Sequence, residues 1–139
     1  MSKHPHERPS FPTPQLPVAW GEVFDKLTIL EIKHERLSDP EKKRNVLREH
    51  DSILSVVGDL KHYPESLGDL IARLKQTNGE LWDIEEGKRD CERRKCFDDS
   101  FIQLARQVYI GNDKRAAVKR EINDLLGSEL KEEKSYAAY

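Results

Sequence analysis

The chain has 139 residues, of which 36% are hydrophobic and 36% are charged, and its formal net charge is −2. This length is typical of one domain, and the even balance of apolar and charged residues favours thin layers of amphipathic helix. A net charge so close to zero excludes the positive field that gathers nucleic acid or anionic lipid. No stretch approaches the roughly 18 apolar residues of a membrane span. With two cysteines and no secretion signal, we expect free thiols and a cytoplasmic location.

Proline marks the N-terminal end of the chain. Residues 1–17, MSKHPHERPSFPTPQLP, hold five of the seven prolines and show no periodic apolar pattern. Because proline removes a backbone hydrogen-bond donor and favours extended conformations, this segment is predicted to be a disordered tail. Residues 18–127 are predicted to form a helical bundle domain, and residues 128–139 are predicted to form a polar C-terminal tail without a core face.

Two amphipathic helices joined by a short turn are expected after the tail. The first covers residues 18–37, and the second ends before Pro64, which cannot continue a helix. In the turn SDP, Ser38 or Asp39 can cap the second helix, with Pro40 in its first turn. The two apolar stripes comprise Trp20, Val23, Phe24, Leu27 and Leu30, and then Val46, Leu47, Ile53, Leu54, Val57 and Leu60.

The rest of the domain also has helical spacing. A third helix has apolar spacings of three and four, which are typical of antiparallel helix pairing. The segment CFDDS then breaks the helix and offers a cap for the next one. A fourth helix is expected to end at Gly111, and a fifth, capped by Asn112, is expected to end at Gly127. No segment alternates like a strand, so we predict an all-α bundle of about five helices built from antiparallel hairpins. The stripe of the third helix comprises Leu67, Leu70, Leu74, Thr77, Leu81 and Ile84.

Two strings in the chain look familiar: GEVFDKLTILEIK at residues 21–33 and NDKRAAVKREINDLLGSELKEEKSY at residues 112–136. With the intervening LWDIEE, they resemble a family of small bacterial helical proteins that has no assigned activity. The similarity spans nearly everything after Pro17. Membership would imply a compact helical protein, and we associate such proteins with surface-polysaccharide gene neighbourhoods. An apolar residue commonly stands where this chain has His34, so the resemblance implies no shared catalytic role for that histidine.

The stretch LEIKHE places polar groups on the apolar stripe of the first helix. At about 100° per residue, Glu31 and His34 share the face that should be core. If the first two helices form an antiparallel hairpin, facing residue numbers sum to about 79, which sets Glu31 opposite His50 or Arg48. One hypothesis is a metal site made by Glu31, His34 and His50. The alternative is a partly buried Glu31 that forms an ion pair with His50 or Arg48.

Acidic and basic residues on other helices suggest a ligand site. Glu-x-x-Asp pairs on the first and third helices have the spacing that helical nucleotide pyrophosphohydrolases use to hold magnesium against phosphate. Basic residues on the last helix could grip a phosphate or a sugar nucleotide. The alternative is a solvated face with pairs between residues three or four apart. The candidate ligand-binding residues are Glu22, Asp25, Lys26, Glu80, Asp83, Asn112, Arg115 and Lys119.

Two functional hypotheses follow from these patterns. The leading one is a non-catalytic binding or assembly protein, an adaptor or regulator that self-associates or binds a protein partner. The family resemblance further implies a link to surface-polysaccharide biosynthesis. The leading hypothesis predicts no cofactor. The competing one is a small helical enzyme or ligand-binding protein for a phosphorylated or nucleotide-sugar substrate, with a divalent metal as an option. The competing hypothesis predicts that Glu22, Asp25, Asp83 and Arg115 converge on one pocket, and neither hypothesis identifies catalytic residues.

Overall fold

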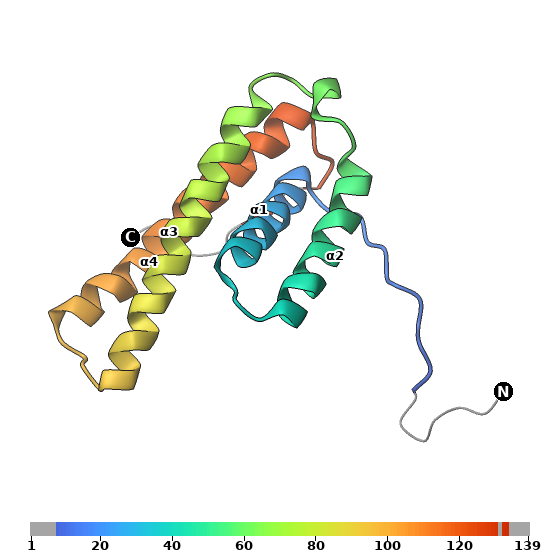
Figure 1. The fold of residues 1–139 in the computed structure, drawn as a ribbon. Coiled ribbons are helices and arrows are strands. Elements are labelled where there is room, and N and C mark those ends of the chain that lie inside the picture. The colour runs from blue at the N-terminus through green and yellow to red at the C-terminus, as the bar shows by residue number, and fades with distance from the viewer. Residues whose placement is uncertain (1–7, 131, 134–139) are drawn as a thin grey trace.

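The computed structural model describes residues 8–130 and 132–133, and within these residues it contains α-helices and a short 3-10 turn but no strand (Figure 1). Residues 8–19 run without helix or strand and are exposed up to Val18. The remaining parts of the two predicted tails, residues 1–7, 131 and 134–139, lie outside the described residues. The elements are α1 (Trp20–Arg36), α2 (Pro40–Val57), η1 (Leu60–His62), α3 (Leu67–Arg94) and α4 (Asp99–Leu126).

The helices form two hairpins, α1–α2 and α3–α4, and the two hairpins contact each other through α1. The long helices α3 and α4 pack against each other along their length, and α1 lies across both of them (Figure 1). Helix α2 packs on α1 and is separated by it from α4. The all-helical fold is therefore confirmed.

Helix ends follow the local chemistry of the sequence. Asp39 caps α2 by accepting a hydrogen bond from the Glu41 N–H at 3.1 Å, with Pro40 in the first turn. Asp98 caps α4 in the same way. Gly127, at φ 63°, ends α4 in the left-handed conformation that glycine adopts without strain. These boundaries agree with the predicted ones.

The predicted break at Gly111 is wrong. Helix α4 runs without interruption through this position, so the chain has four α-helices among the described residues where we expected about five. A Cβ atom at Gly111 would lie 2.6 Å from Cδ2 of Leu81 on α3. The glycine is therefore a point of close approach between two helices, and Asn112 lies inside the helix instead of capping a new one.

The apolar core lies where the start of α1, the end of α2, the start of α3 and the end of α4 meet. Trp20, Phe24 and Tyr63 form an aromatic cluster there, with ring centroids 5.8 to 6.3 Å apart. The Tyr63 hydroxyl donates a hydrogen bond to the Val57 carbonyl at 2.7 Å, which ties the turn to α2. The buried core residues are Phe24, Leu27, Val57, Leu67, Leu70, Leu74, Val118 and Ile122.

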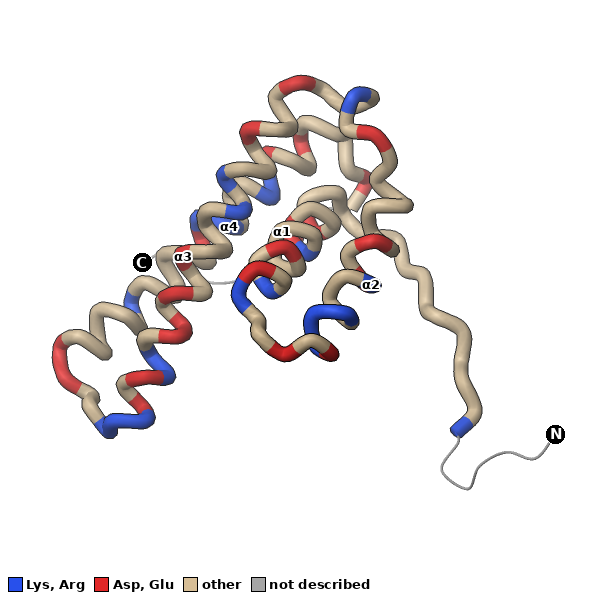
Figure 2. Tube along the Cα trace, viewed as in Figure 1, with Lys and Arg blue, Asp and Glu red and all other residues tan. Residues whose placement is uncertain are grey.

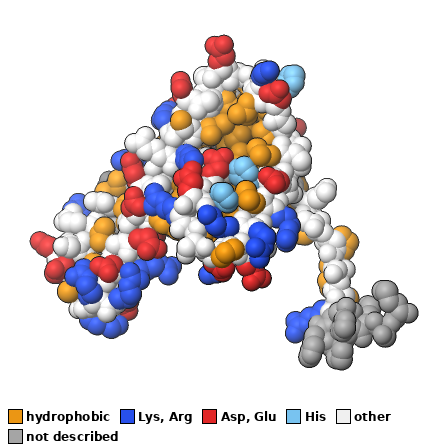
Figure 3. All heavy atoms as spheres, in the orientation of Figure 1, with side chains coloured by type: hydrophobic (Ala, Val, Ile, Leu, Met, Phe, Trp, Pro, Cys, Tyr) orange, Lys and Arg blue, Asp and Glu red, His pale blue; other side chains and the backbone are white. Residues whose placement is uncertain are grey.

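The apolar stripe of α2 is only half covered. Val46 and Val57 are buried against α1, whereas Leu47 and Leu54 each remain 41% exposed. Because α2 has one helical neighbour along its length, that neighbour covers a strip narrower than the full stripe. Figure 3 shows hydrophobic side chains gathered on this face of the molecule, between α2 and α3.

Candidate functional site

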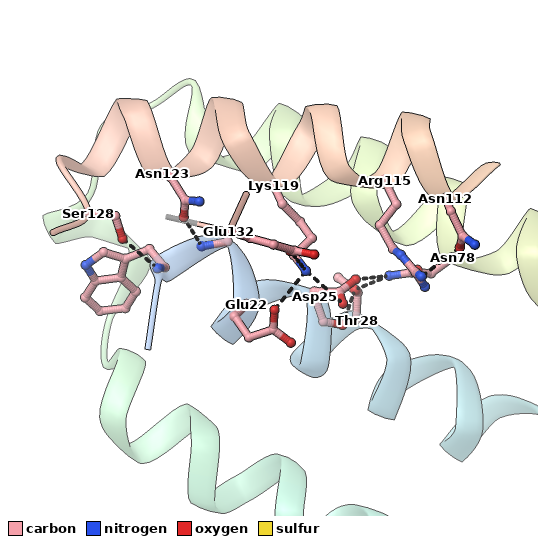
Figure 4. A network of polar contacts seen from close by, with 12 residues as sticks. Glu22, Asp25, Thr28, Asn78, Asn112, Arg115, Lys119, Asn123, Ser128 and Glu132 are labelled. Atoms are coloured by element: carbon pink, nitrogen blue, oxygen red, sulfur yellow. Dashed lines mark hydrogen bonds and ion pairs between the residues drawn. The ribbon is translucent and has the colours of Figure 1, made fainter. Parts of the chain in front are cut away.

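The start of α1 is fixed to the end of α4 by hydrogen bonds to its free backbone donors. The Gly21 N–H donates to Oδ1 of Asn123 at 2.7 Å, and the Trp20 N–H donates to Oγ of Ser128 at 2.9 Å. These contacts satisfy donors that a helix start leaves without an intrahelical partner. A Cβ atom at Gly21 would lie 2.5 Å from the Lys119 carbonyl oxygen, so only glycine allows this approach. The next turn of α1 is thereby placed against α4 (Figure 4).

A buried polar network begins one turn further along α1. Nδ2 of Asn78, on α3, donates to Oδ1 of Asp25 at 2.9 Å and to Oγ1 of Thr28 at 3.1 Å. The Thr28 hydroxyl donates to the Asp25 carbonyl oxygen at 2.9 Å. All three side chains are buried, with at most 6% of each residue exposed. Every polar atom buried among the described side chains has a hydrogen-bond partner, as low-dielectric surroundings require.

Arg115 extends this network onto α4. Its NH1 group donates to Oδ1 of Asn78 at 3.3 Å, and its NH2 group donates to Oδ1 of Asn112 at 2.8 Å (Figure 4). The guanidinium is thus held by two neutral amide oxygens and has no carboxylate within ion-pair distance in the part of the chain that the structure describes. Because amide oxygens are neutral, they do not neutralise the guanidinium, and its positive charge can interact with an anion in the adjacent space.

Lys119 is the most enclosed cation of the site. Its ammonium lies 2.8 Å from Oε2 of Glu22, 2.6 Å from Oε2 of Glu132 and 3.9 Å from Oδ2 of Asp25. Burial lowers the pKa of Lys119, but the hydrogen bonds that its ammonium donates to Glu132 and Glu22, together with the charge of Asp25, outweigh burial and raise this pKa above its ordinary value. Lys119 is therefore charged at neutral pH.

These residues line a pocket of about 350 Å³ between α1 and α4. The pocket combines two cations with three carboxylates, and Ala116 provides its only apolar side chain among the described residues. One carboxylate, that of Glu132, comes from the segment after α4 and is half exposed. The lining residues are Glu22, Asp25, Asn112, Arg115, Ala116, Lys119 and Glu132.

The pocket presents charged and hydrogen-bonding groups to a ligand. The Thr28 hydroxyl is buried and already engaged, and no cysteine lines the pocket among the residues that the structure describes. Its groups can bind an anion through Lys119 and Arg115, and they can accept hydrogen bonds from hydroxyls through Glu22 and Asp25. A small molecule that carries both an anionic group and hydroxyls would therefore be complementary to this pocket.

The other predicted ligand-binding residues lie elsewhere. Lys26 forms an exposed ion pair with Glu49 at 3.3 Å on the α1–α2 side. Asp83 is paired with Arg36 at the end of α1 and does not reach the pocket. Glu80 accepts a hydrogen bond from Gln76 and lines a different hollow of about 530 Å³ between α3 and α4. The expected convergence thus holds for Glu22, Asp25 and Arg115, but not for Asp83.

The hairpin geometry predicted for Glu31 is confirmed. Oε2 of Glu31 lies 3.2 Å from Nε2 of His50, and its Oε1 lies 3.5 Å from the Lys75 ammonium. His34 is half-buried and takes no part in this cluster. No group of three or more His, Cys, Asp and Glu side chains is arranged to hold a metal ion in residues 8–130 and 132–133. The geometry therefore supports a polar contact between Glu31 and His50 and gives the metal hypothesis no support.

Three further residues of the site are not among those that the sequence pattern predicts. Asn78, Thr28 and Asn123 are buried, and each connects α1 to a long helix. Asn78 lies four residues after Leu74 and three before Leu81, so a polar residue at a core position of α3 is the available signal. The neighbouring Thr77, which the spacing places on the stripe, instead donates its hydroxyl to the Arg73 carbonyl within its own helix.

The fold and this pocket define a small all-helical protein with a polar site between α1 and the α3–α4 hairpin. The chain belongs to the family of unknown function DUF6165, whose model matches residues 15–139. This match agrees with the expected membership of a family without an assigned activity. No curated protein and no solved structure matches the chain. Across residues 8–130 and 132–133, no helix has the length and apolar character needed to cross a membrane.

Proposed function

We propose that this protein is a non-catalytic binding protein, a regulator or adaptor, whose α1–α4 pocket holds a small anion that also carries hydroxyl groups. A sugar phosphate or a nucleotide sugar has both kinds of group. A link to surface-polysaccharide biosynthesis would follow from such a ligand. The observation that carries the proposal is the enclosed Lys119 ammonium, which faces a pocket beside the Arg115 guanidinium.

Glu132 supports the anionic part of this proposal. Its carboxylate lies 2.6 Å from the Lys119 ammonium, although it belongs to the segment that follows α4. An anion is thus already accommodated at this position, and a ligand phosphate or carboxylate would take its place. With Glu132 displaced, the remaining charges of Glu22, Asp25, Arg115 and Lys119 cancel, so the empty pocket would not repel an anionic ligand.

The acids of the pocket support the hydroxyl part. Oδ1 of Asp25 accepts from Asn78, whereas its Oδ2 faces Lys119 at the longer distance of 3.9 Å and retains accepting capacity. Glu22 is half exposed at the pocket mouth. Carboxylates in such positions accept hydrogen bonds from sugar hydroxyls, which fixes the orientation of the ligand.

Thermal shift and calorimetric titration of the full chain test the proposal with glucose 1-phosphate, a uridine diphosphate sugar and inorganic phosphate. A ligand at a hundredfold excess over its dissociation constant should add about 2.7 kcal/mol of stability. Lys119→Met should remove this gain. Lys26→Met is the matched control, because Lys26 pairs with Glu49 outside the pocket. An absent gain with all three probes, or an equal gain in both variants, would contradict the proposal.

An enzyme acting on a phosphorylated substrate would use the same pocket, with or without a divalent ion. Phosphorus NMR of the bound probe, with and without added magnesium, separates the two functions. An unchanged spectrum over hours supports a binding protein, and a new phosphate resonance that Lys119→Met abolishes supports an enzyme.

A further inference from the structure

The two long helices extend well beyond the helix that covers them. Helix α1 has 17 residues, whereas α3 and α4 have 28 each. At 1.5 Å per residue, α1 covers about 25 Å of a hairpin about 42 Å long. The end of α1 is marked by Arg36, whose guanidinium lies 5.9 Å from the ring centroid of Trp82. Residues 84–110, here called the distal hairpin, protrude past this point (Figure 1).

The distal hairpin has no core of its own. Cys91 is the one buried residue in 84–110. Other apolar side chains remain about half exposed, including Phe97 at 52% and Ile102 at 49%. Because isolated helices depend on packing of their apolar faces, two helices without a buried core are poorly stabilised in water. The partly covered apolar residues are Ile84, Phe101, Leu104, Val108 and Ile110.

One side of the distal hairpin continues the side that α1 covers. On α4, Phe101, Ala105 and Val108 share a face at spacings of four and three, in line with Asn112 at the candidate pocket. On α3, Glu86 and Arg89 follow Trp82 at spacings of four and three. A hollow of about 340 Å³ is lined by Trp82, Glu86 and Arg89 together with Ile29 of α1. The side that α1 leaves uncovered is thus apolar on α4 and charged on α3.

The charges on α3 change sign along this side. Residues 80–86 include four acids and no base, and residues 88–95 include five bases and two acids (Figure 2). Most charges near the tip form pairs within the helix, such as Arg94 with Asp90 at 2.9 Å. Glu86 and Arg89 are exposed and take part in no ion pair with any residue that the structure describes. An acidic stretch followed by a basic stretch is complementary to an antiparallel copy of itself.

We propose that the distal hairpin packs against the distal hairpin of a second copy of this chain, so that the two hairpins form an antiparallel four-helix bundle. A two-fold axis near residue 88 of α3 sets Glu86 of each copy beside Arg89 of the other, because in such an interface contacts are made reciprocally. The same pairing buries Phe101 and Val108 in a shared core. This proposal does not depend on the ligand of the α1–α4 pocket.

Charge reversal of Glu86 and Arg89 tests the pairing. Sedimentation velocity of the full chain should show a dimer for the wild type at micromolar concentrations. Glu86→Arg and Arg89→Glu should each raise the dissociation constant at least about tenfold, because each places like charges together twice in one dimer. An equimolar mixture of the two single variants should restore the dimer, since both contacts in the mixed pair then join opposite charges. The double variant should dimerise like the wild type.

Arg44→Glu is the matched control, because Arg44 is exposed on α2, which lies on the other side of α1 from the distal hairpin (Figure 1). It should leave the dissociation constant unchanged. Circular dichroism of each variant should show full helix content. A wild type that stays monomeric up to about 100 μM, beyond the range of a specific dimer of this kind, would overturn the proposal. Single variants that dimerise normally would overturn it as well, and so would a mixture that remains monomeric.

Discussion

The two halves of the α3–α4 hairpin are built from the same two helices but are stabilised differently. In the half that α1 covers, Leu74 and Ile122 are completely buried. In the distal hairpin, residues 84–110, the same helices continue with a single buried residue, Cys91. The comparison shows that a long helical hairpin in this chain does not by itself create a buried core. The core ends where the covering helix α1 ends.

Polar residues differ between the halves in the same way. In the covered half they are buried and bonded between helices, as Asn78 is to Asp25 and Thr28. In the distal hairpin the ion pairs join residues three or four apart on one helix, such as Arg93 with Asp90. Exposed pairs of this kind stabilise a protein by only a few tenths of a kcal/mol. The candidate ligand site therefore lies in the half with a buried core, and the proposed interface lies in the half without one.

The largest expected effect is a loss of stability in the half of the molecule that α1 covers. Phe24 is completely buried in the core, so Phe24→Ala should lower the free energy of unfolding by about 3–5 kcal/mol. Urea denaturation followed by circular dichroism measures this change. A loss below about 1 kcal/mol would mean that the core is loosely packed there and would remove the contrast between the halves.

A smaller effect is expected at the contact between α1 and α4. Gly21→Ala forces a Cβ atom against the Lys119 carbonyl oxygen, a backbone atom that cannot move aside, and should destabilise the protein by about 2 kcal/mol. Gly68→Ala is the control, because a Cβ atom at this position on α3 would meet no atom within 4 Å among the described residues. That variant should be neutral or more stable by about 0.5 kcal/mol. Equal thermal midpoints for the two variants would contradict the close approach.

The buried cation gives a pH-dependent prediction with a definite sign. The pKa of Lys119 is raised above its ordinary value of 10.5 in the folded state. Its contribution to stability is therefore fully present below the unfolded pKa and is lost as the pH rises through the folded pKa. The difference in unfolding free energy between the wild type and Lys119→Met should be constant from neutral pH to about pH 9 and should shrink above pH 10.5. A difference that grows in that alkaline range would contradict the assigned ion pairs.

The smallest effect is expected in the distal hairpin. Leu104 contacts the α3 backbone near Gly87 but is only partly buried, so Leu104→Ala should lower the unfolding free energy by about 1 kcal/mol or less. Urea denaturation at low protein concentration measures this loss without the proposed dimer. A loss as large as that of Phe24→Ala would show that the distal hairpin has a core of its own.

Much of the fold could be predicted because helix starts and stops are local. Asp39, Asp98 and Gly127 act through their own backbone neighbourhoods, and each lies where the sequence indicated. The helix end predicted at Gly111 is wrong because the sequence alone does not distinguish two roles of glycine. One glycine ends a helix, and another makes room for a side chain of a neighbouring helix. The distinction depends on Leu81, which is 30 residues earlier in the chain.

The candidate site could be predicted in part for a similar reason. Spacings of three and four show which side chains share a face, and they correctly grouped Glu22 with Asp25 and Arg115 with Lys119. They do not show which face another helix will cover, so Asp83 was grouped with residues that it does not reach. Asn78 was not predicted because it is uncharged and the candidate site was built from charge patterns. Its amide nevertheless connects α1 to α3 and α4.

Native-state hydrogen exchange of the full chain at low and high protein concentration tests the contrast between the two halves most directly. At low concentration, amides of residues 84–94 and 99–110 should open with a free energy at least about 2 kcal/mol below that of amides in residues 70–80 and 114–124. At high concentration, protection of the distal amides should rise toward that of the covered half. Equal protection of the two halves at both concentrations would contradict the account.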